Sequence, residues 1–257
     1  MQVVILAGGY GTRLSEETAV KPKPMVEIGG KPVLWHIMKL YTHHGLTDFI
    51  VCCGYKSEVI KRYFHDYRLN GSDITFDLRN ETTTFHSHEV EPWRVTLVDT
   101  GDATMTGGRL KRVEQFIDGE TFCLAYGDCL SDVDIGELIS VHRAGNALVT
   151  LTAVQPPGRF GVVTLGEDEQ RISSFVEKPE GDGGWVNGGF FVLERAALGY
   201  VDDDSTVWER GPLEVLASEG RAQAYRHRGY WQNLDSLRDK VVLEERWASG
   251  APPWKVW

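Results

Sequence analysis

The chain has 257 residues, of which 42% are hydrophobic, and its formal net charge at pH 7 is −10. This length allows one large α/β domain with a substantial core. The acidic balance excludes a general nucleic-acid binder, which needs a broad basic face. No segment approaches the ~20 consecutive apolar residues of a membrane span, and the first residues lack the basic start of a signal peptide. We therefore expect a single domain over residues 1–257, located in the cytoplasm, with neither nucleic acid nor membrane as a partner.

Strand and helix signals alternate along the chain. Residues 2–7 form an apolar, β-branched run that is typical of a buried strand. The further predicted elements are a helix at 33–41 that begins after Pro32, a strand at 49–53, a helix at 57–67, a strand at 121–125, a helix at 135–143 and a final helix at 236–247. The neighbouring Cys52 and Cys53 should point to opposite faces of their strand. Repeated β-α-β units predict a Rossmann-like, mainly parallel sheet flanked by helices.

Two segments depart from this alternation. Residues 70–92 are polar and carry no clear periodicity, so we expect an excursion used in subunit contact or in covering a substrate. From Leu148 to Val192 the strands are shorter and are separated by Gly and Pro, which predicts a smaller antiparallel extension.

A glycine-rich turn follows the first predicted strand. Gly8, Gly9 and Gly11 allow the backbone to turn sharply and to approach a ligand without side-chain clashes. Backbone N–H groups in such a turn can face phosphate oxygens. Arg13 then adds a planar guanidinium with several N–H donors, and Lys23 adds a compact positive charge. The turn therefore predicts a triphosphate site.

The spacing of this turn differs from that of two common phosphate-binding motifs. It is neither the GxxxxGK[ST] of a P-loop nor the GxGxxG of a dinucleotide site. For three glycines alone, an ordinary tight turn with solvated basic residues would be the preferred interpretation. The basic cluster of Arg13, Lys21 and Lys23 shifts the balance towards phosphate.

A second candidate segment follows the strand predicted at 121–125. Gly127 and Asp128 stand at its carboxyl end, where ligands of open α/β sheets lie, so this segment should meet the glycine-rich turn in one cleft. A buried carboxylate is costly unless a cation accompanies it, so Asp128 is a candidate metal ligand. Asp132 and Asp134 form a rival DxD pair, as used by glycosyltransferases of related fold, although Asp134 also suits a helix start.

The motifs together resemble a known family. The segment LAGGxGTRL at 6–14, followed by the PKP at 22–24, resembles the sugar-nucleotide pyrophosphorylases, which join a nucleoside triphosphate to a sugar 1-phosphate and release pyrophosphate. The blocks that are similar to the cytidylyl branch of this family lie at 26–32, 35–38, 52–56, 91–93, 97–101, 105–112, 156–161, 187–192 and 237–240. They extend over essentially the whole chain. The resemblance implies CTP and glucose 1-phosphate as substrates, CDP-glucose as product, and a homo-oligomer.

The resemblance also implies roles for individual residues. For the nucleotide it implies Leu6, Ala7, Gly8, Gly9, Gly11, Thr12, Arg13, Lys23, Thr104, Arg109, Gly127 and Asp128. Arg13 and Lys23 would be catalytic, and Asp128 and Asp235 would hold Mg²⁺. For the sugar phosphate it implies Glu177, Lys178, Asn187 and Gly188. Residues 1–147 would then mainly bind the nucleotide, and residues 148–257 would supply mainly the sugar-phosphate site and the final helix.

Three of these residues have simpler interpretations. Asp235 would serve as the N-cap of the final helix, Arg109 as a solvated helix residue, and Lys178 as part of an exposed turn. The chain also departs from the family pattern at two positions. Cys129 stands where a glycine is usual after the Gly-Asp, and Asn233 where a proline is usual before the second acid.

The implied reaction needs no protein nucleophile, because a sugar phosphate is mostly dianionic at neutral pH and attacks the α-phosphorus itself. Three alternatives remain open at this point. The first is a glycosyltransferase that uses the DxD pair, the second a pyrophosphorylase for another sugar or nucleotide, and the third a catalytically silent nucleotide-binding regulator.

Overall fold

The computed structural model describes residues 1–87, 90–156, 162–165, 171–176 and 184–257. Its centre is a seven-stranded sheet with the strand order β14-β10-β13-β8-β1-β4-β7. These strands are β1 (Val3–Leu6), β4 (Asp48–Cys53), β7 (Arg94–Asp99), β8 (Thr121–Tyr126), β10 (Val149–Val154), β13 (Val186–Glu194) and β14 (Ala222–Arg226). Within this central sheet, only the pairs that involve β13 are antiparallel, so the expected mainly parallel sheet is confirmed.

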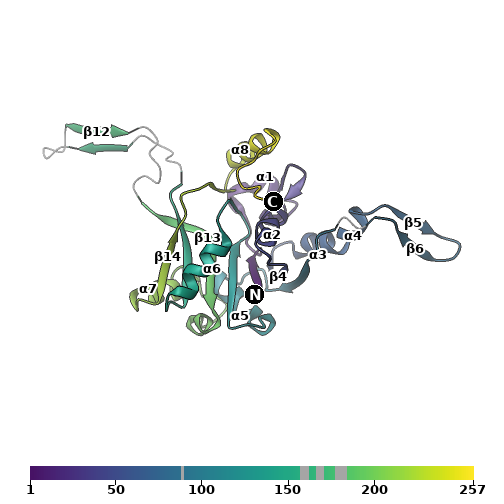
Figure 1. Ribbon diagram of the computed structural model, residues 1–257, viewed down its shortest axis with the longest axis horizontal. Helices are drawn as coiled ribbons and strands as arrows, with labels where there is room; N and C mark the ends of the chain where they lie inside the picture. Colours follow the sequence, from purple (N-terminus) through teal and green to yellow (C-terminus); the bar gives the residue numbers. More distant parts are fainter. Residues whose placement is uncertain (88–89, 157–161, 166–170, 177–183) are drawn as a thin grey trace.

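Helices flank both faces of this sheet (Figure 1). The longer helices are α2 (Val33–His43), α3 (Ser57–His65), α5 (Thr106–Val113), α6 (Ile135–Ala144), α7 (Pro212–Ser218) and α8 (Leu237–Ala248). The short helical turns are α1 (Ser15–Thr18), α4 (Tyr67–Asn70), η1 (Thr12–Leu14), η2 (Lys23–Met25), η3 (Glu114–Phe116) and η5 (Arg195–Tyr200). The helices α2, α6 and α8 lie close to their predicted bounds, whereas the helix predicted at 57–67 is divided into α3 and α4.

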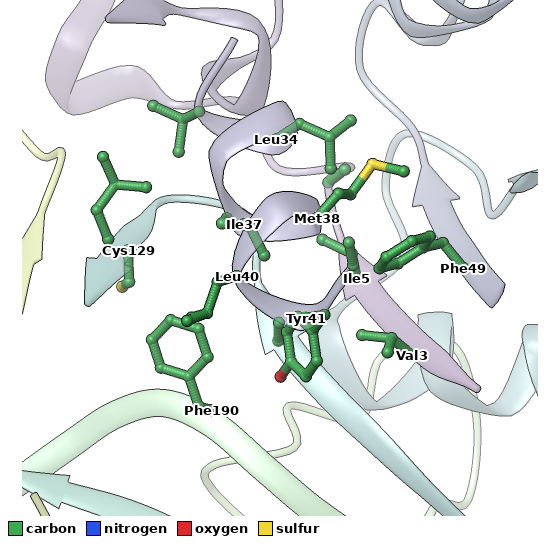
Figure 2. Close-up of a cluster of buried hydrophobic side chains, with 14 of the residues drawn as sticks. Val3, Ile5, Leu34, Ile37, Met38, Leu40, Tyr41, Phe49, Cys129 and Phe190 are labelled. Atoms are coloured by element: carbon green, nitrogen blue, oxygen red, sulfur yellow. The ribbon is translucent and has the colours of Figure 1, made fainter. Parts of the chain in front are cut away.

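The side chains of the central strands alternate between two cores. Val3 and Ile5 of β1 lie in the core covered by α2, α6 and α8, whereas Val4 lies in the core covered by α5 and α7. Cys53 and Cys52 divide in the same way, which confirms that they point to opposite faces. Figure 2 shows how α2 packs across β1 and β4 in the first core.

The antiparallel part of the chain is distributed differently from the expectation. β10 and most of β13 lie in the 148–192 segment, but both belong to the central sheet, where β13 inserts between β10 and β8. A separate antiparallel ribbon is formed by β11 (Val162–Leu165) and β12 (Ile172–Val176). This ribbon projects from one end of the molecule (Figure 1).

The segment 70–92 contains a hairpin that its sequence did not predict. β5 (Ile74–Asp77) pairs antiparallel with β6 (Thr82–Phe85), and the hairpin projects from the end of the molecule opposite to β12 (Figure 1). The polar run Thr82-Thr83-Thr84 is exposed on both faces, so no hydrophobic alternation marks it as a strand.

Two further small sheets lie beside the central one. β2 (Glu27–Ile28) pairs with β3 (Lys31–Pro32), and β9 (Cys129–Ser131) pairs with β15 (Trp231–Asn233). In the part of the chain that the structure describes, no helix is both long and apolar enough to cross a bilayer.

Candidate active site

The cleft lies at the carboxyl ends of β1 and β8. These strands are parallel neighbours, with Leu6 opposite Tyr126, so the loops that follow them emerge side by side. Together with the start of α5 and the loop before α7, they line a cleft of about 380 Å³. All twelve residues expected at the nucleotide line this cleft: Leu6, Ala7, Gly8, Gly9, Gly11, Thr12, Arg13, Lys23, Thr104, Arg109, Gly127 and Asp128. The convergence of the two segments is thus observed.

Two glycines of the turn are required by its geometry. A Cβ on Gly8 would lie 2.1 Å from Nη1 of Arg109, so only glycine permits this close approach. Gly11 has a φ of 63°, the left-handed conformation that favours glycine. The carbonyl of Gly11 accepts a hydrogen bond from Thr18 Oγ1 at 3.0 Å. The shape of the turn is therefore fixed by the protein itself.

Arg109 lies beneath the turn and is only 4% exposed. Its Nη1 donates to the carbonyls of Cys53 and Gly101 and to Thr100 Oγ1, and its Nη2 donates to the carbonyls of Gly8 and Asp102. Burial lowers the pKa of this guanidinium from its ordinary value. The interpretation as a solvated helix residue is therefore wrong, because Arg109 ties the glycine turn to the loop after β7.

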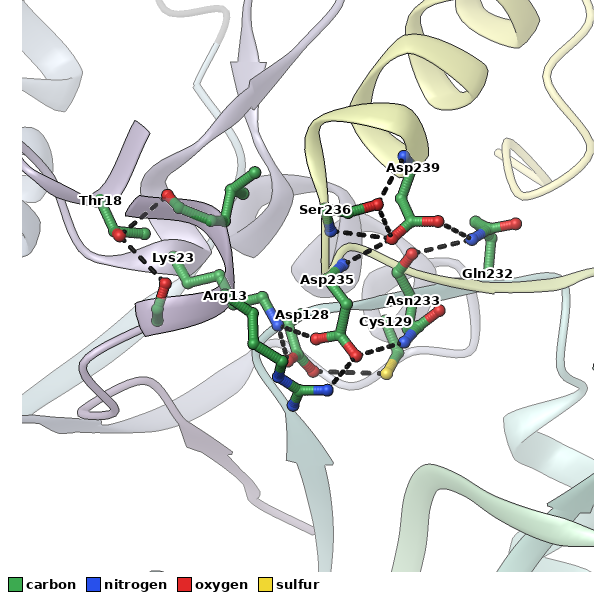
Figure 3. Close-up of polar contacts among 12 residues, drawn as sticks. Arg13, Thr18, Lys23, Asp128, Cys129, Gln232, Asn233, Asp235, Ser236 and Asp239 are labelled. Atoms are coloured by element: carbon green, nitrogen blue, oxygen red, sulfur yellow. Dashed lines mark hydrogen bonds and ion pairs between the residues drawn. The ribbon is translucent and has the colours of Figure 1, made fainter. Parts of the chain in front are cut away.

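A cluster of opposite charges, shown in Figure 3, adjoins the cleft, because Arg13, Lys23 and Asp128 line it. Nζ of Lys23 lies 2.7 Å from Oδ2 of Asp128 and 2.5 Å from Oδ1 of Asp235. Nη1 of Arg13 lies 2.7 Å from Oδ2 of Asp235. Lys21 points elsewhere, since its Nζ lies 3.6 Å from Glu27 Oε1 and it does not line the cleft. Two carboxylates and two cations from distant parts of the chain thus meet at one point.

Lys23 stays charged in this cluster. Its burial lowers the pKa, but the charges of Asp128 and Asp235 and the hydrogen bonds with them outweigh burial, and the pKa is raised above its ordinary value. The side chain of Lys23 is 10% exposed, whereas that of Arg13 is 75% exposed. Arg13 is therefore the cation that is free to turn towards an arriving anion.

Asp235 is not the N-cap of the final helix. That position belongs to Ser236, whose hydroxyl accepts from the backbone N–H of Asp239, while the carboxylate of Asp239 accepts from the N–H of Ser236. This reciprocal capping box satisfies the start of α8 without Asp235. The simpler interpretation of Asp235 is therefore wrong, and its carboxylate faces the cluster.

The two residues that depart from the family pattern both contact the cluster. Cys129 Sγ lies 3.4 Å from Oδ1 of Asp128, and Asn233 Nδ2 donates to Oδ2 of Asp235 at 2.8 Å. Burial, together with the neighbouring Asp128, raises the pKa of the Cys129 thiol well above its usual range. The thiol is therefore neutral and is a donor to the carboxylate.

Each acid of the DxD pair lies next to a group outside the cleft. Oδ1 of Asp132 lies 2.9 Å from Nε2 of His227. Oδ1 of Asp134 accepts from the backbone N–H of Glu137 at 2.8 Å and caps α6, as the simpler interpretation expected. Neither acid lines the cleft, so the geometry does not support a metal site on this pair.

The expected sugar-phosphate residues are described only in part. Asn187 donates through Nδ2 at 3.1 Å to the hydroxyl of Tyr126, which lines the cleft. The carbonyl of Gly188 accepts from Trp231 Nε1 at 2.8 Å. Glu177 and Lys178 lie outside the described residues, and their roles stay predictions.

Tyr126 and Glu209 are among the cleft residues that the sequence did not predict. The hydroxyl of Tyr126 donates to Glu209, whose second oxygen accepts from Thr106 Oγ1 at 2.7 Å. Burial and the charge of Glu209 raise the pKa of Tyr126 above its ordinary value. The position of Tyr126 directly before Gly127 could have identified it as a cleft residue. Glu209 lies in a loop that carries no motif. Both residues line the cleft and connect it to Asn187.

The cleft lies where open α/β folds bind their ligands, at the carboxyl ends of parallel strands. A family model described as nucleotidyl transferase matches residues 2–234, and the chain belongs to this family. Over 258 aligned residues, which cover 100% of both chains, it is 56% identical to the glucose-1-phosphate cytidylyltransferase of Salmonella typhimurium. It is 40% identical, with the same coverage, to the probable glucose-1-phosphate cytidylyltransferase of Bacillus subtilis. The resemblance carried by the motifs is thus confirmed.

A solved structure supports the fold independently. The crystal structure of a UDP-glucose pyrophosphorylase complexed with UDP-glucose superposes with a TM-score of 0.69, and the match covers 97% of this chain and 98% of the other. The two sequences are 17% identical, so this similarity concerns the fold alone.

Proposed function

We propose that the protein transfers a cytidylyl group from CTP to α-D-glucose 1-phosphate and releases pyrophosphate. The proposal rests on the ion-pair cluster of Lys23 and Arg13 with Asp128 and Asp235, which adjoins the cleft lined by the glycine turn. The choice of CTP and glucose 1-phosphate rests on the 56% identity to the Salmonella cytidylyltransferase over the full chain.

In this reaction a phosphate oxygen of the sugar phosphate attacks the α-phosphorus of CTP. A new P–O bond forms, the bond between the α-phosphorus and the bridging oxygen breaks, and pyrophosphate leaves with the electron pair. No side chain has to act as a nucleophile, because the attacking group is already an anion. The protein must instead hold two anions in line and neutralise their repulsion.

Lys23 and Arg13 are suited to different parts of that task. Lys23 is held by two carboxylates, so it would be a fixed positive charge beside the bound triphosphate. Arg13 is exposed and holds a single carboxylate, so its fork can turn to the departing β- and γ-phosphates. The backbone of the glycine turn supplies N–H groups for the remaining oxygens.

The two carboxylates fit a divalent cation. Oxygens of Asp128 and Asp235 already converge on one positive charge, the ammonium of Lys23. No group of three or more metal-binding side chains occurs among the described residues. This donor set suits Mg²⁺, which is commonly bound through one or two carboxylates with substrate phosphates completing its shell. When bound, Mg²⁺ would shield the phosphate charge and orient the triphosphate.

The sugar would lie on the β13 side of the cleft. Asn187 offers an amide there, and the chain from Asn187 through Tyr126 to Glu209 joins this side to the nucleotide side. Glu177 and Lys178 would supply contacts to sugar hydroxyls and to the phosphate. We also propose that residues 1–257 act as one domain within a homo-oligomer in the cytoplasm.

The direct test is incubation of the protein with CTP, glucose 1-phosphate and Mg²⁺, with pyrophosphate and CDP-glucose both quantified. The proposal expects the two products in equal amounts and neither after chelation of Mg²⁺. A glycosyltransferase would instead consume CDP-glucose and release CDP, and a silent regulator would bind CTP without forming product. Either result would refute the proposed reaction.

A further inference from the structure

Cys129 and Asn233 stand directly opposite each other in the β9–β15 ladder. Each is close in sequence to one of the two acids: Cys129 directly follows Asp128, and Asn233 precedes Asp235 by two positions. Their pairing therefore links the two acids through a short piece of sheet. The chain departs from the family pattern at these same two positions. The two departures therefore lie opposite each other in the folded protein.

Their contacts divide the carboxylate oxygens into two sets (Figure 3). Cys129 Sγ contacts Oδ1 of Asp128 at 3.4 Å, and Asn233 Nδ2 contacts Oδ2 of Asp235 at 2.8 Å. The remaining oxygens, Oδ2 of Asp128 and Oδ1 of Asp235, both contact Lys23 Nζ. One oxygen of each acid is thus held by the β9–β15 ladder, and the other faces the shared positive charge.

The two donors of the β9–β15 ladder are held in place by the fold, whereas Arg13 is an exposed side chain. The side chain of Arg13, which also contacts Oδ2 of Asp235, is 75% exposed and is expected to leave for the triphosphate. Cys129 is 4% exposed and Asn233 is half-buried, and both are fixed by the strand pairing. When Arg13 leaves, Asn233 still occupies Oδ2.

We propose that Cys129 and Asn233 are positioning residues that hold Asp128 and Asp235 as single-oxygen ligands of the divalent cation, and that they thereby favour Mg²⁺ over Ca²⁺. This inference rests on the proposed function. Ca²⁺ accepts bidentate carboxylates in a large, flexible shell, whereas Mg²⁺ demands a small, near-octahedral one. A donor on the rear oxygen of each acid obstructs bidentate binding and fixes the carboxylate plane.

The test compares variants that remove or keep a donor. Cys129→Ala and Asn233→Ala remove one donor each, and Cys129→Ser keeps a donor at the same place. Cys123→Ala is the matched control, because Cys123 is a buried thiol of β8 in the same core and does not line the cleft. CTP affinity is measured by calorimetry over a series of Mg²⁺ and Ca²⁺ concentrations, with thermal unfolding as a check of folding and kcat and KM as a second readout.

The two alanine variants at the ladder should raise the Mg²⁺ concentration that gives half-maximal CTP affinity by about 10-fold, the usual effect of losing a donor behind a metal ligand. In these variants, the Mg²⁺ and Ca²⁺ concentrations that give half-maximal CTP affinity should lie closer together than in the unaltered protein. With Cys129→Ser and Cys123→Ala both quantities should stay near those of the unaltered protein. At saturating Mg²⁺, kcat should change much less than the Mg²⁺ requirement.

Two results would overturn the inference and leave the proposed function standing. One is a Cys129→Ser variant that behaves like Cys129→Ala. The other is an unchanged metal preference in both alanine variants while Asp128→Asn loses its Mg²⁺ response. If Asp128→Asn and Asp235→Asn also kept the normal Mg²⁺ response, the metal assignment itself would fail, and this inference with it.

Discussion

Nζ of Lys23 lies 2.5 Å from Oδ1 of Asp235, although 212 positions of sequence separate the two residues. Lys23 comes from the loop region after β1, and Asp235 from the short connection between β15 and α8. Asp128, which follows β8, completes the contact at 2.7 Å from the same ammonium. The cluster therefore joins the beginning, middle and end of the chain at the carboxyl edge of the sheet.

We expect Arg13→Ala and Lys23→Ala each to lower kcat/KM for CTP by roughly 10² or more, because each removes a positive charge that acts on the triphosphate during transfer. Steady-state kinetics with circular dichroism of the same preparations provides the measurement. Lys21→Ala is the matched control, since Lys21 pairs with Glu27 away from the cleft and should keep its activity. Near-normal kinetics in the Arg13 and Lys23 variants would show that the turn is an ordinary tight turn with solvated basic residues.

Substitution of Asp128 or Asp235 should reduce turnover much more than substitution of the DxD pair. Asp128→Asn and Asp235→Asn should each abolish most turnover, and the double variant should be little worse than either, because residues that act as a unit are not additive. Pyrophosphate release measures this directly. Asp134→Asn should be mild, since asparagine is also a good N-cap.

The reverse pattern would contradict this assignment. If Asp132→Asn and Asp134→Asn were inactive while Asp235→Asn kept its activity, the metal would belong to the DxD pair. The glycosyltransferase interpretation would then be the better one.

Arg109 should be needed for both folding and nucleotide binding. In Arg109→Lys a single ammonium replaces a fork that contacts five oxygens, so several buried carbonyls lose their donor. We expect the free energy of unfolding to fall by on the order of 3 kcal/mol and CTP affinity to fall with it. Denaturant unfolding and calorimetry measure the two effects. Arg112→Lys, on the same helix but exposed and paired with Asp204, should change both little.

The sequence predicted those parts of the site that depend on local chemistry. An apolar strand followed by a glycine-rich turn predicts a ligand-binding turn, and at Gly8 and Gly11 the observed geometry requires glycine. Asp128 was found because it follows a second buried strand at the same edge of a parallel sheet. The motif resemblance then added Asp235, which the local pattern alone would have treated as a helix cap.

Other features depended on long-range contacts that no local pattern carries. β9 and β15 are three residues each and lie about a hundred positions apart, so their pairing, and with it the contact of Cys129 and Asn233 with the acids, was not predictable. The second strand of the hairpin, β6, begins with three exposed threonines, so it lacks the apolar alternation that identifies a strand. Arg109 binds backbone carbonyls, and these leave no signature in the sequence.

His36 should make stability depend on pH. Burial lowers the pKa of His36 from 6.5 to about 4, while Nε2 of the neutral ring contacts the carbonyl of Ile28 at 2.9 Å. Between these two values the unfolded chain binds a proton that the folded protein does not, so the free energy of unfolding falls as the pH falls from 6.5 to 4. This single group accounts for about 3 kcal/mol over that range.

The measurement is denaturant unfolding of the unaltered protein and of His36→Gln at several pH values. The variant should be less stable at pH 7 and should lose less stability on acidification, because it has no proton to take up at this position. Parallel pH profiles of the two proteins would show that His36 titrates normally in the folded state.

The central claim is tested most directly by kcat/KM for CTP, UTP, dTTP, ATP and GTP, each with glucose 1-phosphate and Mg²⁺ and with pyrophosphate release followed. A site that binds the 4-amino edge of cytosine leaves buried groups unpaired with uracil, and mismatches of this kind lower kcat/KM by at least about 100-fold. The account predicts that CTP is preferred over UTP by such a factor. Equal or faster turnover with UTP would contradict it.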